Sequence, residues 1–216
     1  MHKLRYIKLS RFQIGLDGRN IYNSGVVLFT EVRNYSTMNP ILAELQSLEQ
    51  ESLARGIPII GSKKGAWLLQ KIQQIKPQHI LELGTANGYS GCILGSAGAE
   101  LTTIEVNSII AEEARQNFKK HRIKARVLAG DAVEIVKRLA TDKSEFYDLI
   151  FIDFAKKKYF EVLEPSLKLV KKGGFIIADN IAMDGCQDYK DAVMNHPQLK
   201  TELVPIKDGL SCSQKI

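Results

Sequence analysis

Oxygen-bearing side chains follow two apolar runs of this sequence. Asp153 comes directly after Leu149–Ile152, and Asp179 and Asn180 come directly after Phe175–Ala178. Two carboxylates and an amide oxygen suit a hard cation, and without a nearby His or Cys they do not favour zinc. They predict a site for Mg²⁺, with Ca²⁺ or Mn²⁺ as alternatives, that leaves positions open for water and a bidentate substrate. A cation there would also relieve the repulsion between the two carboxylates.

A lysine follows the first of these runs. Lys156 lies three residues after Asp153, where the expected strand turns into a helix, so its amine can point back to the same site. A neighbouring cation favours the neutral amine because like charges repel, which makes Lys156 the candidate general base. The run Lys156–Lys158 would stand in the first turn of a helix, where the dipole disfavours positive charge, so we expect an anionic group close by. A strand-end cap and a solvated helix terminus are the structural alternatives for Asp153 and Lys156.

A glycine-containing loop follows a third apolar run. Residues Leu81–Ser90 have the sequence LELGTANGYS, in which Gly84 and Gly88 would let a ligand approach the backbone closely. Glu105, at the end of the next expected strand, could accept both hydroxyls of a ribose. A dinucleotide loop has the spacing G-x-G-x-x-G, whereas this loop has G-x-x-x-G, and Glu82 just before it would repel a pyrophosphate. S-adenosylmethionine fits better, because it has cationic ammonium and sulfonium groups and no phosphate.

A further strand end completes the expected cofactor site. Gly130, Asp131 and Ala132 follow the apolar run Ala125–Ala129 and could reach the edge of an adenine ring. Asp131 would also cap a helix over residues 132–140. The two roles are compatible.

These side chains need a scaffold that brings strand ends together. From residue 39 the sequence alternates helical periods with short apolar runs, which predicts a doubly wound α/β domain whose parallel strands are covered on both faces. The carboxyl ends of parallel strands lie at one edge of the sheet, where ligands bind. The expected strands are His79–Leu83, Leu101–Glu105, Ala125–Ala129, Leu149–Asp153 and Phe175–Ala178, followed by a hairpin of Thr201–Ile206 and Leu210–Lys215 around Lys207-Asp208-Gly209.

Two helices are expected before the first strand. Pro40–Ala54 is amphipathic and ends at Gly56 and Pro58, and Ser62 is expected to cap the second helix. We divide the chain into residues 1–38, a basic arm in which Val26–Tyr35 could form a helix, and residues 39–216, the α/β domain. The expected apolar positions are Ile41, Leu42, Leu45, Leu48 and Leu53 in the first helix and Ala66, Leu68, Leu69 and Ile72 in the second.

Composition restricts the class of protein. The 216 residues, 44% hydrophobic and 25% charged, have the size of one α/β domain with a full core. No apolar run reaches the ~20 residues that span a bilayer, so no membrane partner is expected, and the N-terminus has no secretory pattern. Cys92, Cys186 and Cys212 are odd in number and lack metal-ligand spacing, so we expect buried thiols and a cytoplasmic protein.

The net charge of +6 is concentrated near the N-terminus. Residues 1–20 hold five Lys and Arg against one Asp, which leaves little excess charge for the remaining 196 residues. A solvated extension is the ordinary interpretation of such an arm. Contact with RNA, with a partner subunit or with the rim of the substrate site are the alternatives.

In this order the motifs resemble those of the cation-dependent O-methyltransferases, the family that includes catechol and caffeoyl-CoA O-methyltransferases. The resemblance implies a class I S-adenosylmethionine-dependent methyltransferase with a Rossmann-like seven-stranded sheet of order 3-2-1-4-5-7-6, an antiparallel last strand and a homodimeric assembly. It spans residues 26–216 and rests on Gly56–Ile60, Gly65, Leu81–Ser90, Glu105, Gly130-Asp131-Ala132, Ile152-Asp153, Lys156, Tyr159, Gly173-Gly174, Ala178-Asp179-Asn180 and Asp208-Gly209-Leu210.

The resemblance also implies roles for individual residues. Asp153, Asp179 and Asn180 would bind the metal, and Lys156 would deprotonate an acceptor hydroxyl for in-line attack on the sulfonium methyl group. S-adenosylmethionine would be held by Ile60, Glu82, Gly84, Ala86, Gly88, Ser90, Glu105, Gly130, Asp131, Ala132 and Asp153.

Departures from the family pattern leave the acceptor open. Asn87 stands where relatives usually have Thr or Cys, and Phe154-Ala155 replaces a larger or more polar pair. A small catechol-like or phenolic acceptor is the leading hypothesis. The alternative acceptor is a hydroxylated wobble uridine in transfer RNA, whose phosphates the basic arm and Lys156–Lys158 would contact. A non-catalytic S-adenosylmethionine-binding protein is a third hypothesis. The complete set of metal and base candidates argues against it.

Overall fold

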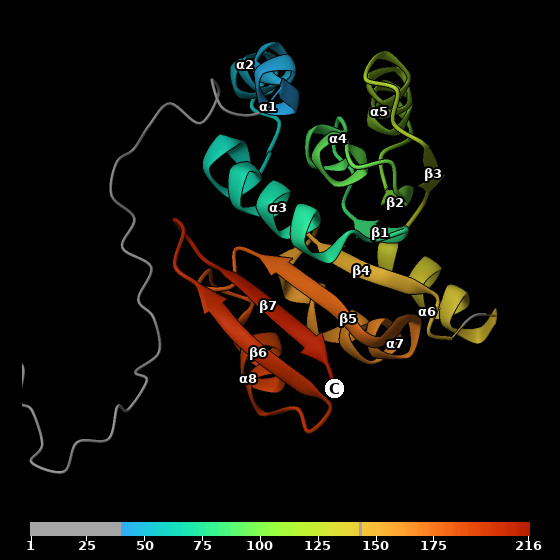
Figure 1. Ribbon diagram of the computed structural model, residues 1–216, viewed down its shortest axis with the longest axis vertical. Coiled ribbons are helices and arrows are strands. Elements are labelled where there is room, and N and C mark those ends of the chain that lie inside the picture. Colours follow the sequence, from blue (N-terminus) through green and yellow to red (C-terminus); the bar gives the residue numbers. More distant parts are fainter. Residues whose placement is uncertain (1–39, 143) are drawn as a thin grey trace, which may run out of the picture. The chain divides into compact units, whose positions relative to one another are not determined.

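The computed structural model describes residues 40–142 and 144–216, and these contain a seven-stranded sheet of order β3-β2-β1-β4-β5-β7-β6 (Figure 1). The predicted strand order is confirmed. The basic arm and the helix expected over Val26–Tyr35 lie outside the described residues. Of the two groups of residues behind the transfer RNA alternative, the structure therefore describes Lys156–Lys158 and not the arm. The strands are β1 His79–Leu83, β2 Glu100–Glu105, β3 Ala125–Ala129, β4 Tyr147–Ile152, β5 Val170–Asp179, β6 Leu199–Val204 and β7 Leu210–Lys215.

The direction of the strands places the expected site residues at one edge. Strands β1 to β5 pair in parallel, and β7 pairs antiparallel with both β5 and β6. The carboxyl ends of β1 to β5 therefore lie together, and the β6–β7 turn joins them because β7 begins where β5 ends.

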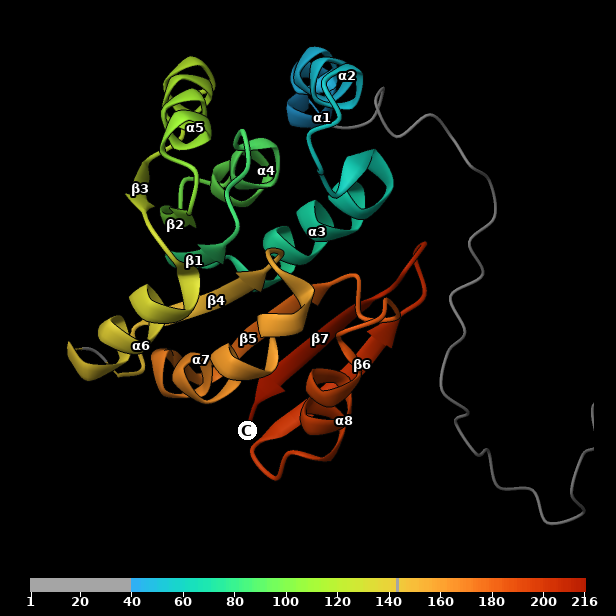
Figure 2. The same ribbon diagram turned by 180° about the vertical axis from the view of Figure 1, so that it is seen from behind.

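Helices cover both faces of the sheet, as predicted (Figure 1 and Figure 2). Helices α1 to α5 share one apolar core with the sheet, and α6 to α8 share the other. In the described part of the chain, none of the helices has the length and apolar character needed to cross a membrane. The helices are α1 Pro40–Glu44, α2 Gln46–Ala54, α3 Gly61–Ile75, α4 Tyr89–Gly95, α5 Ser108–Lys120, α6 Ala132–Asp142, the 3-10 helices η2 Lys156–Lys158 and η3 Phe160–Val162, α7 Leu163–Leu169 and α8 Gln187–Asn195.

Burial differs between the middle and the edge of the sheet. The residues of β1 and β4 are almost all buried between the two helix layers, as expected of parallel strands. The same expectation is wrong for β3, whose residues range from half-buried to exposed. Within residues 40–142 and 144–216 it is an edge strand that pairs only with β2, so no described strand covers its outer side.

The first expected helix is interrupted, and one of its core positions is wrong. Pro40–Ala54 forms two helices that meet at Leu45. Leu42, Leu45 and Leu48 are buried, whereas Leu53 is 64% exposed. At 3.6 residues per turn, a position five residues after Leu48 points roughly 140° away from it.

The expected cap of the second helix is also wrong. Helix α3 begins at Gly61, so Ser62 lies inside it and makes no side-chain cap. The carboxylate of Glu49 accepts a hydrogen bond from the Ser62 backbone N–H at 2.8 Å. A side chain of α2 thus satisfies a free amide at the start of α3, which anchors this end of the helix beside the sheet edge.

The three cysteines are buried free thiols, as predicted. Burial raises the pKa of the Cys92 thiol to about 12 and that of Cys212 to about 11. Such thiols stay protonated at neutral pH and are poor nucleophiles.

Candidate active site

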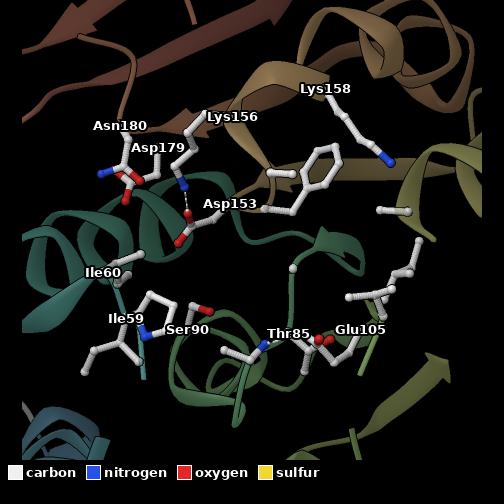
Figure 3. Close-up of a pocket in the computed structure, with 18 of the residues that line it drawn as sticks. Ile59, Ile60, Thr85, Ser90, Glu105, Asp153, Lys156, Lys158, Asp179 and Asn180 are labelled. Atoms are coloured by element: carbon white, nitrogen blue, oxygen red, sulfur yellow. Dashed lines mark hydrogen bonds and ion pairs between the residues drawn. The ribbon is translucent and has the colours of Figure 1, made fainter. Parts of the chain in front are cut away.

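A cavity of about 590 Å³ opens at the carboxyl edge of the sheet (Figure 3). Its volume is in the range of small-molecule sites. Its walls come from the loops after β1 to β5, the start of α3 and the β6–β7 turn. Most of the predicted site residues line it: Ile60, Gly84, Ala86, Ser90, Glu105, Gly130, Asp131, Ala132, Asp153, Lys156, Asp179 and Asn180.

Glu82 lies behind the cavity wall and does not line it. Its side chain is fully buried, and its two oxygens accept hydrogen bonds from Ser90 Oγ at 2.6 Å and from Thr103 Oγ1 at 2.7 Å. Burial raises the pKa of Glu82 to about 8, although both hydrogen bonds oppose the shift. Glu82 therefore orients Ser90, which does reach the cavity, while direct contact between Glu82 and a cofactor stays a prediction.

The glycines of the loop after β1 are required by the packing of the protein itself. Gly84 has φ +100°, and a Cβ there would collide with the backbone oxygen of Asp153. Gly88 also lies outside the cavity lining, at φ +92°, and a Cβ there would come within 3.1 Å of the Phe118 ring. Close approach of a ligand was the predicted reason for both glycines. The structure adds another, because this loop packs directly against the end of β4 and against α5.

Glu105 holds the other side of the loop. Its two carboxylate oxygens accept hydrogen bonds from the backbone N–H groups of Ala86 and Asn107, both at 2.9 Å. A carboxylate has about four lone-pair sites, so two remain for the hydroxyls of a ribose. The side chain is thereby fixed in an orientation that faces the cavity.

Asp131 caps α6, as predicted. Its Oδ1 accepts hydrogen bonds from the backbone N–H groups of Val133 at 2.8 Å and Glu134 at 3.4 Å. Its Oδ2 accepts one from Lys158 Nζ at 2.7 Å, and this bond is the main cause that lowers the pKa of Asp131. Lys158 was not identified individually from the sequence, yet it forms the rim of this end of the cavity.

Lys156 and Asp153 meet at the opposite end. Lys156 Nζ donates a hydrogen bond to Asp153 Oδ1 at 2.7 Å (Figure 3). Lys156–Lys158 was expected in the first turn of a helix, and these residues form a short 3-10 helix ahead of α7. The anionic partners of this run are individual carboxylates, Asp153 for Lys156 and Asp131 for Lys158.

Asp179 is buried beside an unpredicted cation. It is 1% exposed, and Lys64 of α3, also 1% exposed, donates a hydrogen bond to its Oδ1 at 2.5 Å. Burial and the charge of Asp153 nevertheless raise the pKa of Asp179. Lys64 could have been noticed in the sequence, because it precedes Leu68 and Ile72 at helical spacing on an otherwise apolar face.

The residues at this end fit an oxygen-liganded cation. After burial, the charge of Asp153 is the second cause that raises the pKa of Asp179, and a cation between the two carboxylates would relieve their repulsion. Among residues 40–142 and 144–216 no group of three or more His, Cys, Asp or Glu side chains could hold a metal ion. A cation here would therefore depend on the amide oxygen of Asn180 as a third protein ligand.

The comparisons with known proteins agree with this geometry. A family model described as O-methyltransferase matches residues 32–216. A catechol O-methyltransferase of Niastella koreensis is 32% identical over 152 residues, which cover 67% of this chain and 67% of that protein. The crystal structure of a candidate caffeoyl-CoA O-methyltransferase from Staphylococcus aureus superimposes with a TM-score of 0.75 and 27% identity, over 85% of this chain and 96% of that one.

A third likeness concerns the fold. An O-methyltransferase from Bacillus cereus, crystallised in complex with SAH, has a TM-score of 0.72 and 23% identity, over 88% of this chain and 94% of that one. The seven-stranded order 3-2-1-4-5-7-6 is thus found together with the family match over most of the sequence. The chain belongs to the O-methyltransferase family and is an S-adenosylmethionine-dependent O-methyltransferase.

Proposed function

We propose that this enzyme methylates a hydroxyl group of a small catechol-like or phenolic acceptor and depends on a divalent cation, with Mg²⁺ preferred. The observation that carries the proposal is the meeting of Asp153, Asp179 and Asn180 with Lys156 in the cavity that also contains the loop after β1 (Figure 3). The names of two similar proteins support the acceptor class, because catechol and caffeoyl groups both have two adjacent ring hydroxyls.

Different residues of the cavity would hold different parts of S-adenosylmethionine. Glu105 and Asp131 would hold the adenosine part of S-adenosylmethionine, and the backbone around Gly84 and Ala86 would lie along it. Ser90 would meet its amino-acid part, oriented by the buried hydrogen bond to Glu82. With the cofactor held by these residues, its sulfonium methyl group would face Lys156 and the proposed cation ligands.

The proposed cation ligands supply oxygens only. A hard divalent cation bound there lowers the pKa of an acceptor hydroxyl and orients it. Two carboxylates and one amide leave room for two acceptor oxygens, which favours a vicinal diol over an isolated hydroxyl.

Lys156 is the proposed base. Its Nζ lies 5.5 Å from the ring centroid of Tyr159, which is fully buried and stacks on Phe154. Lys156 Nζ would accept the proton of the acceptor hydroxyl. The oxygen attacks the methyl carbon in line, the carbon–sulfur bond breaks with its electrons going to sulfur, and S-adenosylhomocysteine leaves.

A pair of neighbouring lysines tests the base. Lys156→Ala should lower kcat for catechol at least about 100-fold, the usual contribution of general base catalysis, with little change in cofactor affinity. Lys157→Ala is the matched control, because Lys157 is exposed and does not line the cavity, and it should keep wild-type turnover. Unchanged turnover of Lys156→Ala over a panel of acceptors would rule out this role.

A further inference from the structure

Asp208 lies beside the proposed cation ligands although it comes from the last hairpin. Antiparallel pairing joins Asp179 with Leu210, so the turn before β7 passes the end of β5. Two backbone hydrogen bonds hold it there, from Ala182 N to Asp208 O at 2.9 Å and from Ile181 N to Gly209 O at 3.3 Å. The sheet register thus fixes where the Asp208 carboxylate can reach.

The Asp208 carboxylate determines which way the Asn180 amide faces. Asn180 Nδ2 donates a hydrogen bond to Asp208 Oδ2. A carboxylate can only accept, so the amide atom that faces Asp208 has to be the nitrogen, and Oδ1 is turned the other way. In Figure 3 the nitrogen of Asn180 points away from Asp153. The atom left for a cation is therefore the oxygen.

Lys64 fixes the carboxylate in turn. Its Nζ donates hydrogen bonds to Asp208 Oδ1 and to Asp179 Oδ1. Both oxygens of Asp208 are thus engaged, one by Lys64 and one by Asn180. Because Lys64 belongs to α3 and is almost fully buried, the pair of carboxylates is tied to a helix that is itself part of the core.

The backbone of Asn180 is consistent with a side chain that has to be oriented. Its φ is +58°, in the left-handed region that most side chains avoid and that asparagine tolerates better than most. Glycine would suit this backbone equally well but would offer no amide.

We infer that Asp208 is a positioning residue for the cation site, which holds the Asn180 amide so that Oδ1 faces the cation. The inference rests on the proposed function, because it requires that a divalent cation binds. Hydrogen-bond partners of metal ligands usually change metal affinity about 10- to 100-fold when they are removed. Asp208 would contribute in this way without touching the cation.

A double-mutant cycle separates orientation from charge. The affinity for Mn²⁺ would be measured, without acceptor, from the electron paramagnetic resonance signal of the free ion. The proteins would be the wild type, Asp208→Ala, Asn180→Ala and the double variant. Asp208→Ala should weaken binding about 10- to 100-fold, and in the Asn180→Ala background it should weaken binding no further. Asp184→Ala, which removes an exposed carboxylate outside the cavity lining, is the charge control and should bind as the wild type does.

The outcomes distinguish the inference from the proposed function. If the effects of the two single variants add, Asp208 acts through its charge, and the inference is wrong while the cation site stands. If the wild type binds no Mn²⁺, both fail. S-adenosylmethionine affinity reports folding, and Asp208→Asn replaces the alanine variant if that one does not fold, with the same non-additivity expected.

A second measurement needs no cation. The side-chain amide ¹⁵N–¹H signals of Asn180 in the metal-free protein should be displaced by the carboxylate and should move toward those of free asparagine in Asp208→Ala. Unchanged signals would contradict the hydrogen bond from which the inference starts.

Discussion

Glu82 and Asp179 are two buried carboxyl groups whose partners give them different tasks. Hydroxyl groups of Ser90 and Thr103 surround Glu82, whereas the ammonium of Lys64 contacts Asp179. Burial raises the pKa of both, but only Asp179 lines the cavity. Glu82, with its pKa at about 8, is an uncharged anchor for Ser90 at neutral pH. Asp179 lies beside the charged groups of Lys64 and Asp153, at the position proposed for a cation ligand.

Glu82 should make the stability of the cofactor-free protein depend on pH. Its pKa is about 8 in the fold and 4.5 in the unfolded chain, so the folded state binds the proton more tightly. Its contribution is therefore complete below pH 4.5 and is lost as the pH rises through about 8. In urea unfolding across this range, the part of the unfolding free energy that Glu82 contributes should decline by a few kcal/mol, on the order that such a shift implies.

Glu82→Gln is the control for this prediction. The amide keeps the shape and cannot ionise, so the difference in unfolding free energy between the two proteins should shrink or reverse as the pH rises. A difference that is constant from pH 4.5 to pH 8 would contradict the buried neutral carboxyl. Other titrating groups are common to both proteins and cancel.

At the scale of elements, the loop after β1 and the end of β4 form one packed unit. Gly84 lies so close to the Asp153 backbone that a Cβ added at Gly84 would collide with the Asp153 carbonyl oxygen, so the proposed cofactor loop is packed directly against the first proposed cation ligand. The backbone hydrogen bond from Asp153 N to Leu83 O, at 2.8 Å, joins the same two segments. A change in one should therefore disturb the other.

Gly84→Ala tests this coupling. The new Cβ would collide with the Asp153 carbonyl, so the variant should lose more than the roughly 1–3 kcal/mol that a left-handed backbone costs a non-glycine residue, and Mn²⁺ affinity should fall. Gly98→Ala is matched, because Gly98 has φ +89° and nothing within 4 Å of the added Cβ. Equal losses of unfolding free energy in the two variants would show that the collision does not matter.

The sequence predicted the elements whose local pattern is complete. His79–Leu83, Ala125–Ala129 and Leu210–Lys215 were predicted with the ends that the structure has. Strand β5 begins at Val170, five residues before the prediction. Lys171, Lys172 and two glycines interrupt the apolar pattern there, so the sequence did not predict this part as a strand. In the structure Val170 pairs with Tyr147 of β4.

The sequence predicted those site residues that stand at the end of a strand. It did not predict contacts between residues from distant segments of the chain. Asp179 ends a strand and Asp153, Asn180 and Lys156 lie just after strands, and the parallel sheet brings them to one cavity as expected. The contact of Lys64 with Asp208 joins residues 144 positions apart. A spacing motif cannot indicate a pair that is so far apart in the sequence. The one indication was that Lys64 stands on an otherwise apolar helix face.

At the scale of the whole molecule, the proposed cofactor site and the proposed cation site lie at the same edge of the sheet. The ends of β1, β2 and β3 supply the proposed cofactor site, and the ends of β4 and β5 supply the proposed cation site and the base. Family membership establishes methyl transfer to oxygen. We propose that the cation holds the acceptor between the cofactor site and the base. Cation removal should therefore abolish turnover while S-adenosylmethionine still binds.

The most direct measurement is the transfer of a labelled methyl group from S-adenosylmethionine to catechol by the full chain, after EDTA treatment and after Mg²⁺ is restored. We expect that turnover is lost with EDTA, returns with Mg²⁺ and is much lower for phenol, which has one hydroxyl, while cofactor affinity is unchanged throughout. Full turnover of catechol in EDTA would contradict this expectation.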